Sequence, residues 1–162
     1  VDMARCDLQR TAIVHATGSG GTQAGLNAGV LLHDVPADVI SYAVCDDEAY
    51  FNEKAQQDWD NLRAKRSDLP NKPIKTQTVE SYIGPGYGRA GSEVFDTLTE
   101  LAALEGIALD PVYTGKAFHG LIADLEAGTF RSDASDIIFV HTGGVFGIFP
   151  HASAVKAALD SD

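Results

Sequence analysis

Short apolar runs alternate along this chain with longer segments in which apolar residues recur every three or four positions. The runs are typical of strands buried on both faces of a sheet, and they lie at 12–16, 39–45 and 136–141. The longer segments have helical period and lie at about 21–32, 48–66, 92–105 and 115–127. This alternation is typical of strand-helix units with parallel strands. The sequence therefore predicts an α/β fold, a twisted and mostly parallel sheet with helices on both faces.

The length and the charge of the chain limit the kinds of partner that it can bind. Its 162 residues are the usual size of one domain, so we expect a single α/β domain over 1–162. The net charge of −11 repels phosphate backbones and anionic lipid surfaces. No apolar run reaches the roughly 18 residues that a membrane span needs. We therefore expect neither a nucleic-acid partner nor a membrane partner.

The cysteines and histidines indicate neither a disulfide framework nor a metal site. Cys6 and Cys45 are the only cysteines, and no charged and apolar leader opens the chain. This pattern suits two buried thiols in a reducing cytoplasm. The histidines show no metal-ligand spacing with each other or with the cysteines, so no metal is predicted. The chain begins with Val1, which suggests a processed start, a tag remnant or a fragment.

A turn of small residues and hydroxyls joins the first predicted strand to the first predicted helix. Such a turn exposes consecutive backbone amides at a helix N-terminus and so forms a phosphate cradle without Lys or Arg. The alternative is a plain glycine-rich turn. Gln23 stands where a dinucleotide-binding motif needs Gly, and no Gly-Lys-Ser/Thr occurs, so NAD and ATP are excluded. The candidate phosphate-binding residues are Thr17, Gly18, Ser19, Gly20, Gly21 and Thr22.

Three further segments place a hydroxyl or an aromatic ring beside glycine, where the backbone can approach a ligand. They are 83–88, 110–116 and 141–144. Each has a simpler interpretation. Tyr87 could be a packed surface aromatic, His141 a hydrogen-bonded core histidine, and Lys116 a solvated charge.

Taken in order, these segments resemble one family. They read Thr-Gly-Ser-Gly-Gly-Thr-Gln-Ala-Gly-Leu at 17–26, Gly-Tyr-Gly at 86–88, Leu-Asp-Pro-Val-Tyr-Thr-Gly-Lys-Ala at 109–117 and Ile-Phe-Val-His-Thr-Gly-Gly at 138–144. This series is similar to the D-cysteine desulfhydrase and 1-aminocyclopropane-1-carboxylate (ACC) deaminase group. That group belongs to the tryptophan synthase β-like, fold-type II enzymes that use pyridoxal phosphate. The resemblance covers about residues 11–150 and implies the large cofactor-binding domain of such an enzyme.

The resemblance implies pyridoxal phosphate as cofactor and suggests which residues contact it. The loop 17–22 would bind the cofactor phosphate, in agreement with the amide cradle. Thr142, beside Gly143, would be the partner of the pyridine nitrogen, and Thr114 is the second candidate. In the deaminase branch a Glu directly follows the tyrosine, where this sequence has Thr114.

The resemblance also implies an activity. Tyr87 and Tyr113 match the two active-site tyrosines of the family, which face a small amino-acid substrate and position its carboxylate or move protons. The complete protein would be a lyase that eliminates sulfide from D-cysteine, or sulfite from L-cysteate, and releases pyruvate and ammonia. The family resemblance further suggests a homodimer.

The family's Schiff-base lysine has no counterpart in this chain. In the family, that lysine and the serine after it lie well before the phosphate loop, whereas this chain starts just before the loop. The chain therefore resembles the C-terminal half of a larger enzyme and is expected to be inactive alone. The alternative is a non-catalytic half that binds a phosphate ligand or pairs with a chain carrying the lysine. None of the lysines has the family's lysine context: Lys54, Lys65, Lys72, Lys75, Lys116 and Lys156.

Overall fold

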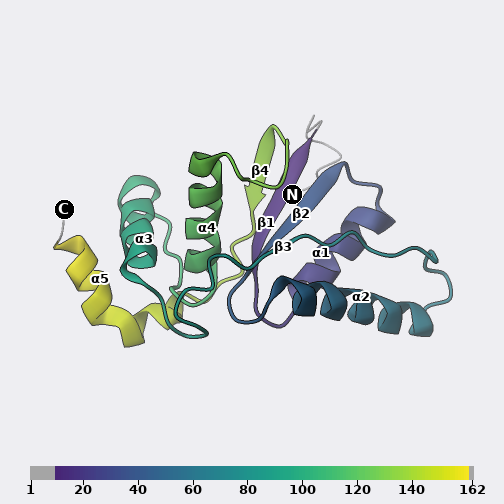
Figure 1. The fold of residues 1–162 in the computed structure, drawn as a ribbon, viewed down its shortest axis with the longest axis horizontal. Helices are drawn as coiled ribbons and strands as arrows, with labels where there is room; N and C mark the ends of the chain where they lie inside the picture. The colour runs from purple at the N-terminus through teal and green to yellow at the C-terminus, as the bar shows by residue number, and fades with distance from the viewer. Residues whose placement is uncertain (1–9, 161–162) are drawn as a thin grey trace.

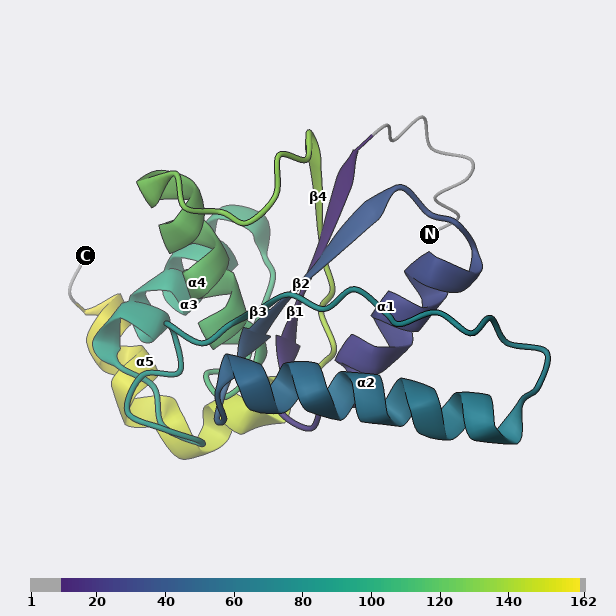
Figure 2. The ribbon, with the colours of Figure 1, turned by 45° about the vertical axis from the view of Figure 1, so that its right-hand side comes forward.

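The structure contains the parallel sheet that the sequence predicts. The computed structural model describes residues 10–160, and Figure 1 and Figure 2 show its arrangement. One sheet of four strands has the order β3-β2-β1-β4, and every strand pair is parallel. The strands are β1 (Thr11–Thr17), β2 (Ala37–Ala43), β3 (Thr78–Val79) and β4 (Asp136–Phe139). The helices are α1 (Gly21–Leu32), α2 (Glu48–Lys65), α3 (Ser92–Glu105), α4 (Thr114–Ala127), the 3-10 helix η2 (Val145–His151) and α5 (Ala152–Leu159).

The central strand β1 lies between β2 and β4. In register, Val14 of β1 pairs with Ile40 of β2 and with Phe139 of β4. From β1 the chain steps outward through α1 to β2 and through α2 to β3. It then returns through α3 and α4 to β4 on the other side of β1. Open parallel sheets bind ligands at the carboxyl ends of their strands where the winding reverses, and here that point lies between β1 and β4.

Helices cover both faces of the sheet. Figure 1 shows α1 and α2 on one side and α4 on the other, with α3 and α5 beyond α4. Because strand residues alternate between faces, the two cores draw on different residues. The core on the α4 side contains Val14, Ala16, Ile40, Tyr42, Ala117 and Leu121. The core between α1 and α2 contains Ala24, Ala28, Ala55 and Trp59, whereas Gly25 and Leu32 of α1 are exposed, so α1 is buried along one face only.

A buried polar network lies on the sheet face that α1 and α2 cover. The Nε2 atom of His15 lies 2.8 Å from the Ser41 hydroxyl. The Gln23 amide donates a 2.8 Å hydrogen bond to the Thr78 hydroxyl. The Thr78 hydroxyl in turn donates to Asn52 Oδ1 over 2.8 Å. These bonds replace the contacts with water that burial removes, and they tie the short strand β3 to α1 and α2.

The fold class is as predicted, and the differences concern short elements. The helices α1 and α3 have the predicted bounds, and α2 and α4 differ from prediction by one residue. The sequence pattern does not predict β3, η2 or α5. A strand of two residues is too short for a periodic pattern, and η2 contains Pro150, which obscures a helical reading. No helix within residues 10–160 is long and apolar enough to cross a membrane.

Candidate active site

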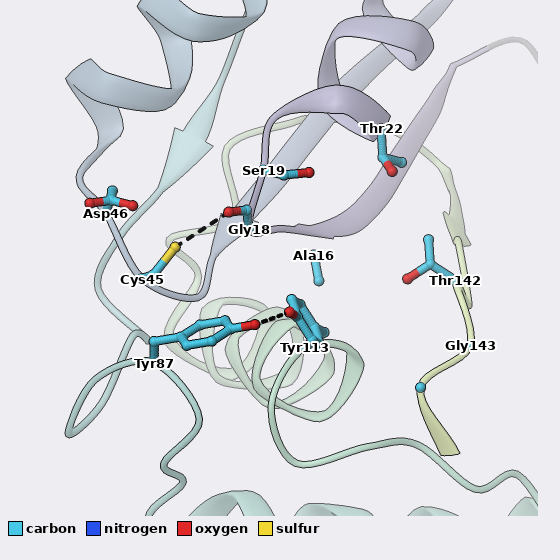
Figure 3. A pocket seen from close by; sticks show the side chains of 11 residues that line it. Ala16, Gly18, Ser19, Thr22, Cys45, Asp46, Tyr87, Tyr113, Thr142 and Gly143 are labelled. Atoms are coloured by element: carbon cyan, nitrogen blue, oxygen red, sulfur yellow. Dashed lines mark hydrogen bonds between the residues drawn. The ribbon is translucent and has the colours of Figure 1, made fainter. Parts of the chain in front are cut away.

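A cavity of about 650 Å³ opens at the carboxyl ends of the strands, where the winding reverses. Its walls come from the turn after β1, the turn after β2, the loop 83–88, the residue before α4 and the segment after β4. Figure 3 shows these side chains around one space. The lining residues are Ala16, Gly18, Ser19, Thr22, Cys45, Asp46, Tyr87, Tyr113, Thr142, Gly143 and Gly144.

The turn between β1 and α1 is suited to an anion. Gly20 is the N-cap of α1 and has a φ of 82°, in the left-handed region that favours glycine. No side chain caps this helix, and its first turn carries no acidic residue. The first-turn amides therefore remain available to a bound anion at the positive end of the helix dipole. Ser19 and Thr22 line the cavity at this point and add hydroxyl groups.

Gly18 brings the backbone of this turn against the tyrosine side of the cavity. A Cβ atom at Gly18 would lie 2.9 Å from Cε1 of Tyr113, closer than real Cβ atoms approach their neighbours, and at a tight 3.1 Å from Cγ2 of Val44. The side chain of Thr17 is buried, and its hydroxyl has no hydrogen-bond partner in the described part of the chain. Of the predicted loop residues, Gly18, Ser19 and Thr22 line the cavity, whereas Thr17, Gly20 and Gly21 do not.

Tyr87 and Tyr113 lie next to each other on one side of the cavity, as Figure 3 shows. Their hydroxyl groups are hydrogen-bonded to each other, and their rings pack edge to face with centroids 5.9 Å apart. The hydrogen bond to Tyr87, together with burial, raises the pKa of Tyr113 to about 12. The Tyr113 hydroxyl is therefore protonated at neutral pH and can donate a hydrogen bond.

Asp110 holds Tyr113 in place at the start of α4. Its Oδ2 atom accepts hydrogen bonds from the amides of Val112 and Tyr113, at 2.9 and 2.8 Å. Its Oδ1 atom accepts from the amide and the hydroxyl of Thr114, at 2.9 and 2.8 Å. Thr114 is fully buried and does not line the cavity. The structure therefore brings Tyr113 to the cavity and directs the Thr114 side chain to the helix cap.

The segment after β4 supplies Thr142 and Gly143 to the opposite wall. Figure 3 shows the Thr142 hydroxyl turned toward the space in front of Ala16. The amide of Gly143 donates to Nδ1 of His141 over 3.1 Å, so Nε2 carries the proton and donates to the carbonyl of Ala108 over 3.0 Å. His141 is hydrogen-bonded as the simpler interpretation has it, but it is exposed and not a core residue.

The cavity contains two residues that the sequence analysis did not assign to it. Cys45 and Asp46 follow β2 and line the cavity beside Gly18. The Cys45 thiol donates to the Gly18 carbonyl over 3.6 Å. Burial and a hydrogen bond with Asp46 raise the pKa of Cys45, so the thiol is protonated at neutral pH. Both residues could have been predicted as site residues from their position at the carboxyl end of a buried strand. The same position identified the turn after β1. The second cysteine, Cys6, lies outside the described residues.

Lys116 is not a solvated charge, contrary to its simpler interpretation. Its side chain is only 1% exposed. The ammonium group donates to the carbonyls of Ile83 and Gly86, at 2.7 and 2.8 Å. None of the lysines within residues 10–160 lines the cavity.

Comparison with known proteins identifies the family. Residues 3–143 match the profile of the family described as "Pyridoxal-phosphate dependent enzyme". The chain belongs to this family, whose members depend on pyridoxal phosphate. The uncapped N-terminus of α1, with neutral donors around it, fits the phosphate of that cofactor.

Individual relatives agree with the resemblance seen in the sequence. A mitochondrial bifunctional D-cysteine desulfhydrase/ACC deaminase of Arabidopsis thaliana is 37% identical over 155 residues, 94% of this chain and 37% of that protein. A D-cysteine desulfhydrase of Yersinia pestis is 38% identical over 143 residues, 87% of this chain and 42% of that protein. The chain spans less than half the length of these curated relatives.

A solved structure supports the fold assignment. The crystal structure of an ACC deaminase homologue superposes with a TM-score of 0.76 at 30% sequence identity, and the match covers 96% of this chain and 46% of that one. The parallel sheet with helices on both faces is thus the fold of a fold-type II enzyme, as the resemblance implied.

Proposed function

We propose that this chain forms part of the large cofactor-binding domain of a pyridoxal phosphate-dependent lyase. The proposed reaction on D-cysteine consumes one water and releases sulfide, pyruvate and ammonia. One observation carries the proposal: an uncapped helix N-terminus and a hydrogen-bonded tyrosine pair open onto one cavity. The similarity to D-cysteine desulfhydrases supports the substrate class.

In this proposal the turn 17–22 binds the cofactor phosphate. The amides in the first turn of α1 provide the main donors, and the hydroxyls of Ser19 and Thr22 add to them. Thr142, next to Gly143, donates a neutral hydrogen bond to the ring nitrogen. When bound, the cofactor supplies the electron sink for the bond that breaks in the substrate.

The tyrosine pair acts on the substrate. Tyr113 keeps its proton at neutral pH because its pKa is about 12, so its hydroxyl can donate to the substrate carboxylate. Tyr87 is the more exposed partner and can accept or return a proton as the substrate reacts. The hydrogen bond between the two hydroxyls keeps both groups aimed at the same side of the cavity.

The neutral Thr142 favours elimination over ring opening. A carboxylate beside the ring nitrogen would hold that nitrogen protonated and strengthen the electron sink. A hydroxyl leaves a weaker sink, which suits a substrate that expels a good leaving group from its β-carbon at once. Asp46, the carboxylate in the cavity lining, lies on the far side from Thr142 in Figure 3. We therefore propose that sulfide or sulfite is the leaving group.

The test is a comparison of substrates on the complete protein. We expect kcat/KM for D-cysteine or L-cysteate, followed by pyruvate release, to exceed kcat/KM for ACC, followed by 2-oxobutyrate release. Tyr87→Phe and Tyr113→Phe are expected to lower the preferred activity, whereas Tyr50→Phe, at an exposed site on α2, serves as control. Equal or greater activity on ACC contradicts the proposed substrate class. Analytical ultracentrifugation of the same protein tests the homodimer.

The part played by the present chain can be tested on its own. Because no lysine within residues 10–160 lines the cavity, we propose that this chain alone does not form a Schiff base with pyridoxal phosphate. This observation also favours the alternative of a non-catalytic half that binds the phosphate group. The expected result is cofactor binding that inorganic phosphate competes away, without the visible absorption of a lysine Schiff base. Such absorption, stable to dialysis and lost in Lys116→Met, would contradict both the proposal that this chain alone forms no Schiff base and the alternative of a non-catalytic half.

A further inference from the structure

Lys116 is a buried cation without a carboxylate partner. It forms no ion pair within residues 10–160, and burial lowers its pKa. It also lies in the first turn of α4, where the helix dipole disfavours a positive charge. Removing an ammonium group from water is costly unless its hydrogen bonds are replaced. The two carbonyl groups that accept hydrogen bonds from the Lys116 ammonium group in place of water are therefore important for its stability.

Both carbonyl acceptors belong to the loop that carries Tyr87. They are the carbonyls of Ile83 and Gly86, and Gly86 directly precedes Tyr87. Gly84, Gly86 and Gly88 have positive φ angles. A loop so rich in glycine loses much conformational entropy when it is ordered, so it needs an external anchor.

The backbone of Lys116, at the other end of this side chain, lies close to Tyr113 in the sequence. Lys116 follows Tyr113 by three residues, so the two lie about one helical turn apart at the start of α4. One side chain thus connects the loop that carries one tyrosine with the helix that carries the other. The hydrogen bond between the two tyrosine hydroxyls spans the same two elements.

We propose that Lys116 is a positioning residue that anchors the loop 83–88 to α4 and so holds Tyr87 against Tyr113. The effect of Lys116 on catalysis rests on the proposed function, because Lys116 acts through the tyrosine pair. The effect of Lys116 on the position of the pair does not depend on any activity. The two effects are therefore measured separately.

The first experiment titrates Tyr113 in the complete protein. Tyrosine labelled with ¹³C at Cζ is followed by NMR, and the Tyr113 signal is assigned with Tyr113→Phe. In wild type, Tyr113 is expected to be largely protonated at about pH 10.5, because its pKa is about 12. In Lys116→Met the loop is released, the hydrogen bond to Tyr87 is lost, and the pKa of Tyr113 is expected to fall toward the ordinary tyrosine value of about 10.

The sign of this change separates anchoring from charge. Removing a nearby cation would by itself raise a tyrosine pKa, whereas losing the anchor lowers it. Lys156→Met removes an exposed lysine on α5 and is the matched control, with no expected change. An unchanged or raised Tyr113 pKa in Lys116→Met overturns the proposal. If that variant does not fold, Lys116→Gln keeps an uncharged NH2 donor group and is expected to lower the Tyr113 pKa partly. No lowering of the Tyr113 pKa in this variant overturns the proposal.

The second experiment measures coupling to Tyr87. Lys116→Met is expected to raise KM for the amino acid about ten-fold, the size expected for losing hydrogen bonds to a charged group, with cofactor affinity retained. Lys116→Met combined with Tyr87→Phe is expected to be no worse than Tyr87→Phe alone, since both act through one group. Additive losses overturn the proposal. A protein without lyase activity would refute the proposed function and leave the tyrosine titration as the deciding result.

Discussion

Asp110 and Thr114 hydrogen-bond to each other in both directions. The Thr114 hydroxyl donates to Oδ1 of Asp110 over 2.8 Å and accepts from the Asp110 amide over 3.1 Å. These two hydrogen bonds occupy the Thr114 hydroxyl at the start of α4. Between the two residues that the family resemblance offers for the cofactor nitrogen, the structure therefore favours Thr142, which lines the cavity.

Replacing Thr114 with Val should affect stability and not the cofactor. Two buried hydrogen bonds to Asp110 are lost, so we expect the free energy of unfolding to fall by about 1–3 kcal/mol. The absorption spectrum of the bound cofactor should stay the same. Urea unfolding and visible spectroscopy are the measurements, and Thr76→Val is the control because its hydroxyl makes no hydrogen bond in the described residues. A shifted spectrum with unchanged stability would restore Thr114 as the nitrogen partner.

Gly18→Ala should weaken cofactor binding. The new Cβ would lie 2.9 Å from the Tyr113 ring, so either the turn or the ring must move. We expect the cofactor dissociation constant to rise about ten-fold, in line with about 1.4 kcal/mol of strain. Gly25→Ala, on α1 with open space around its Cβ, is the matched control, and it should leave binding unchanged and stabilise the helix by up to about 1 kcal/mol. Equal affinities in wild type and Gly18→Ala would place the phosphate elsewhere.

Buried His15 predicts a loss of stability in mild acid. Burial lowers its pKa from 6.5 to about 4, so the folded state resists protonation that the unfolded chain accepts. The resulting stability is fully present above pH 6.5 and is lost as the pH falls toward about 4. At about 1.4 kcal/mol per pKa unit, it amounts to roughly 3 kcal/mol. Urea unfolding of His15→Gln should show this part of the pH dependence removed, while His33→Gln, at an exposed site, keeps it. Identical pH profiles for wild type and His15→Gln would contradict the assignment.

Tyr87→Phe should lower the pKa of Tyr113. The hydrogen bond that the Tyr113 hydroxyl donates to Tyr87 is the main cause of the raised pKa of about 12, so its removal shifts ionisation toward that of free tyrosine. In wild type, this group contributes stability below about pH 10, which is lost as the pH rises through about 12. Alkaline titration followed by tyrosine absorbance checks both points, and Tyr50→Phe is the control for the loss of one tyrosine. A Tyr113 pKa that does not change in Tyr87→Phe would show that burial alone sets it.

The accuracy of the sequence predictions varied with the range of the interactions involved. The bounds of α3 follow from helical periodicity and from Gly91 and Gly106 at its two ends, and the start of α1 follows from the glycines of the preceding turn, which are local signals. The turn after β1 could be located because a glycine-rich link between a strand and a helix determines its own backbone geometry. The two-residue strand β3 could not be located, because the buried hydrogen bonds of Thr78 to Gln23 and Asn52 come from distant segments.

The class of fold and the family follow from the sequence alone, as do the positions of the turn after β1 and of the two tyrosines that line the cavity, because each is marked by residues adjacent in the chain. The contacts of charged and hydroxyl side chains depend instead on how distant segments pack together. Lys116 looks like a solvated charge until the carbonyls of Ile83 and Gly86, thirty or more residues upstream, are placed around its ammonium group. Thr114 likewise looks available until folding directs its hydroxyl to Asp110. The free energy of a polar side chain depends on what replaces its water, and the packing of distant segments determines that replacement.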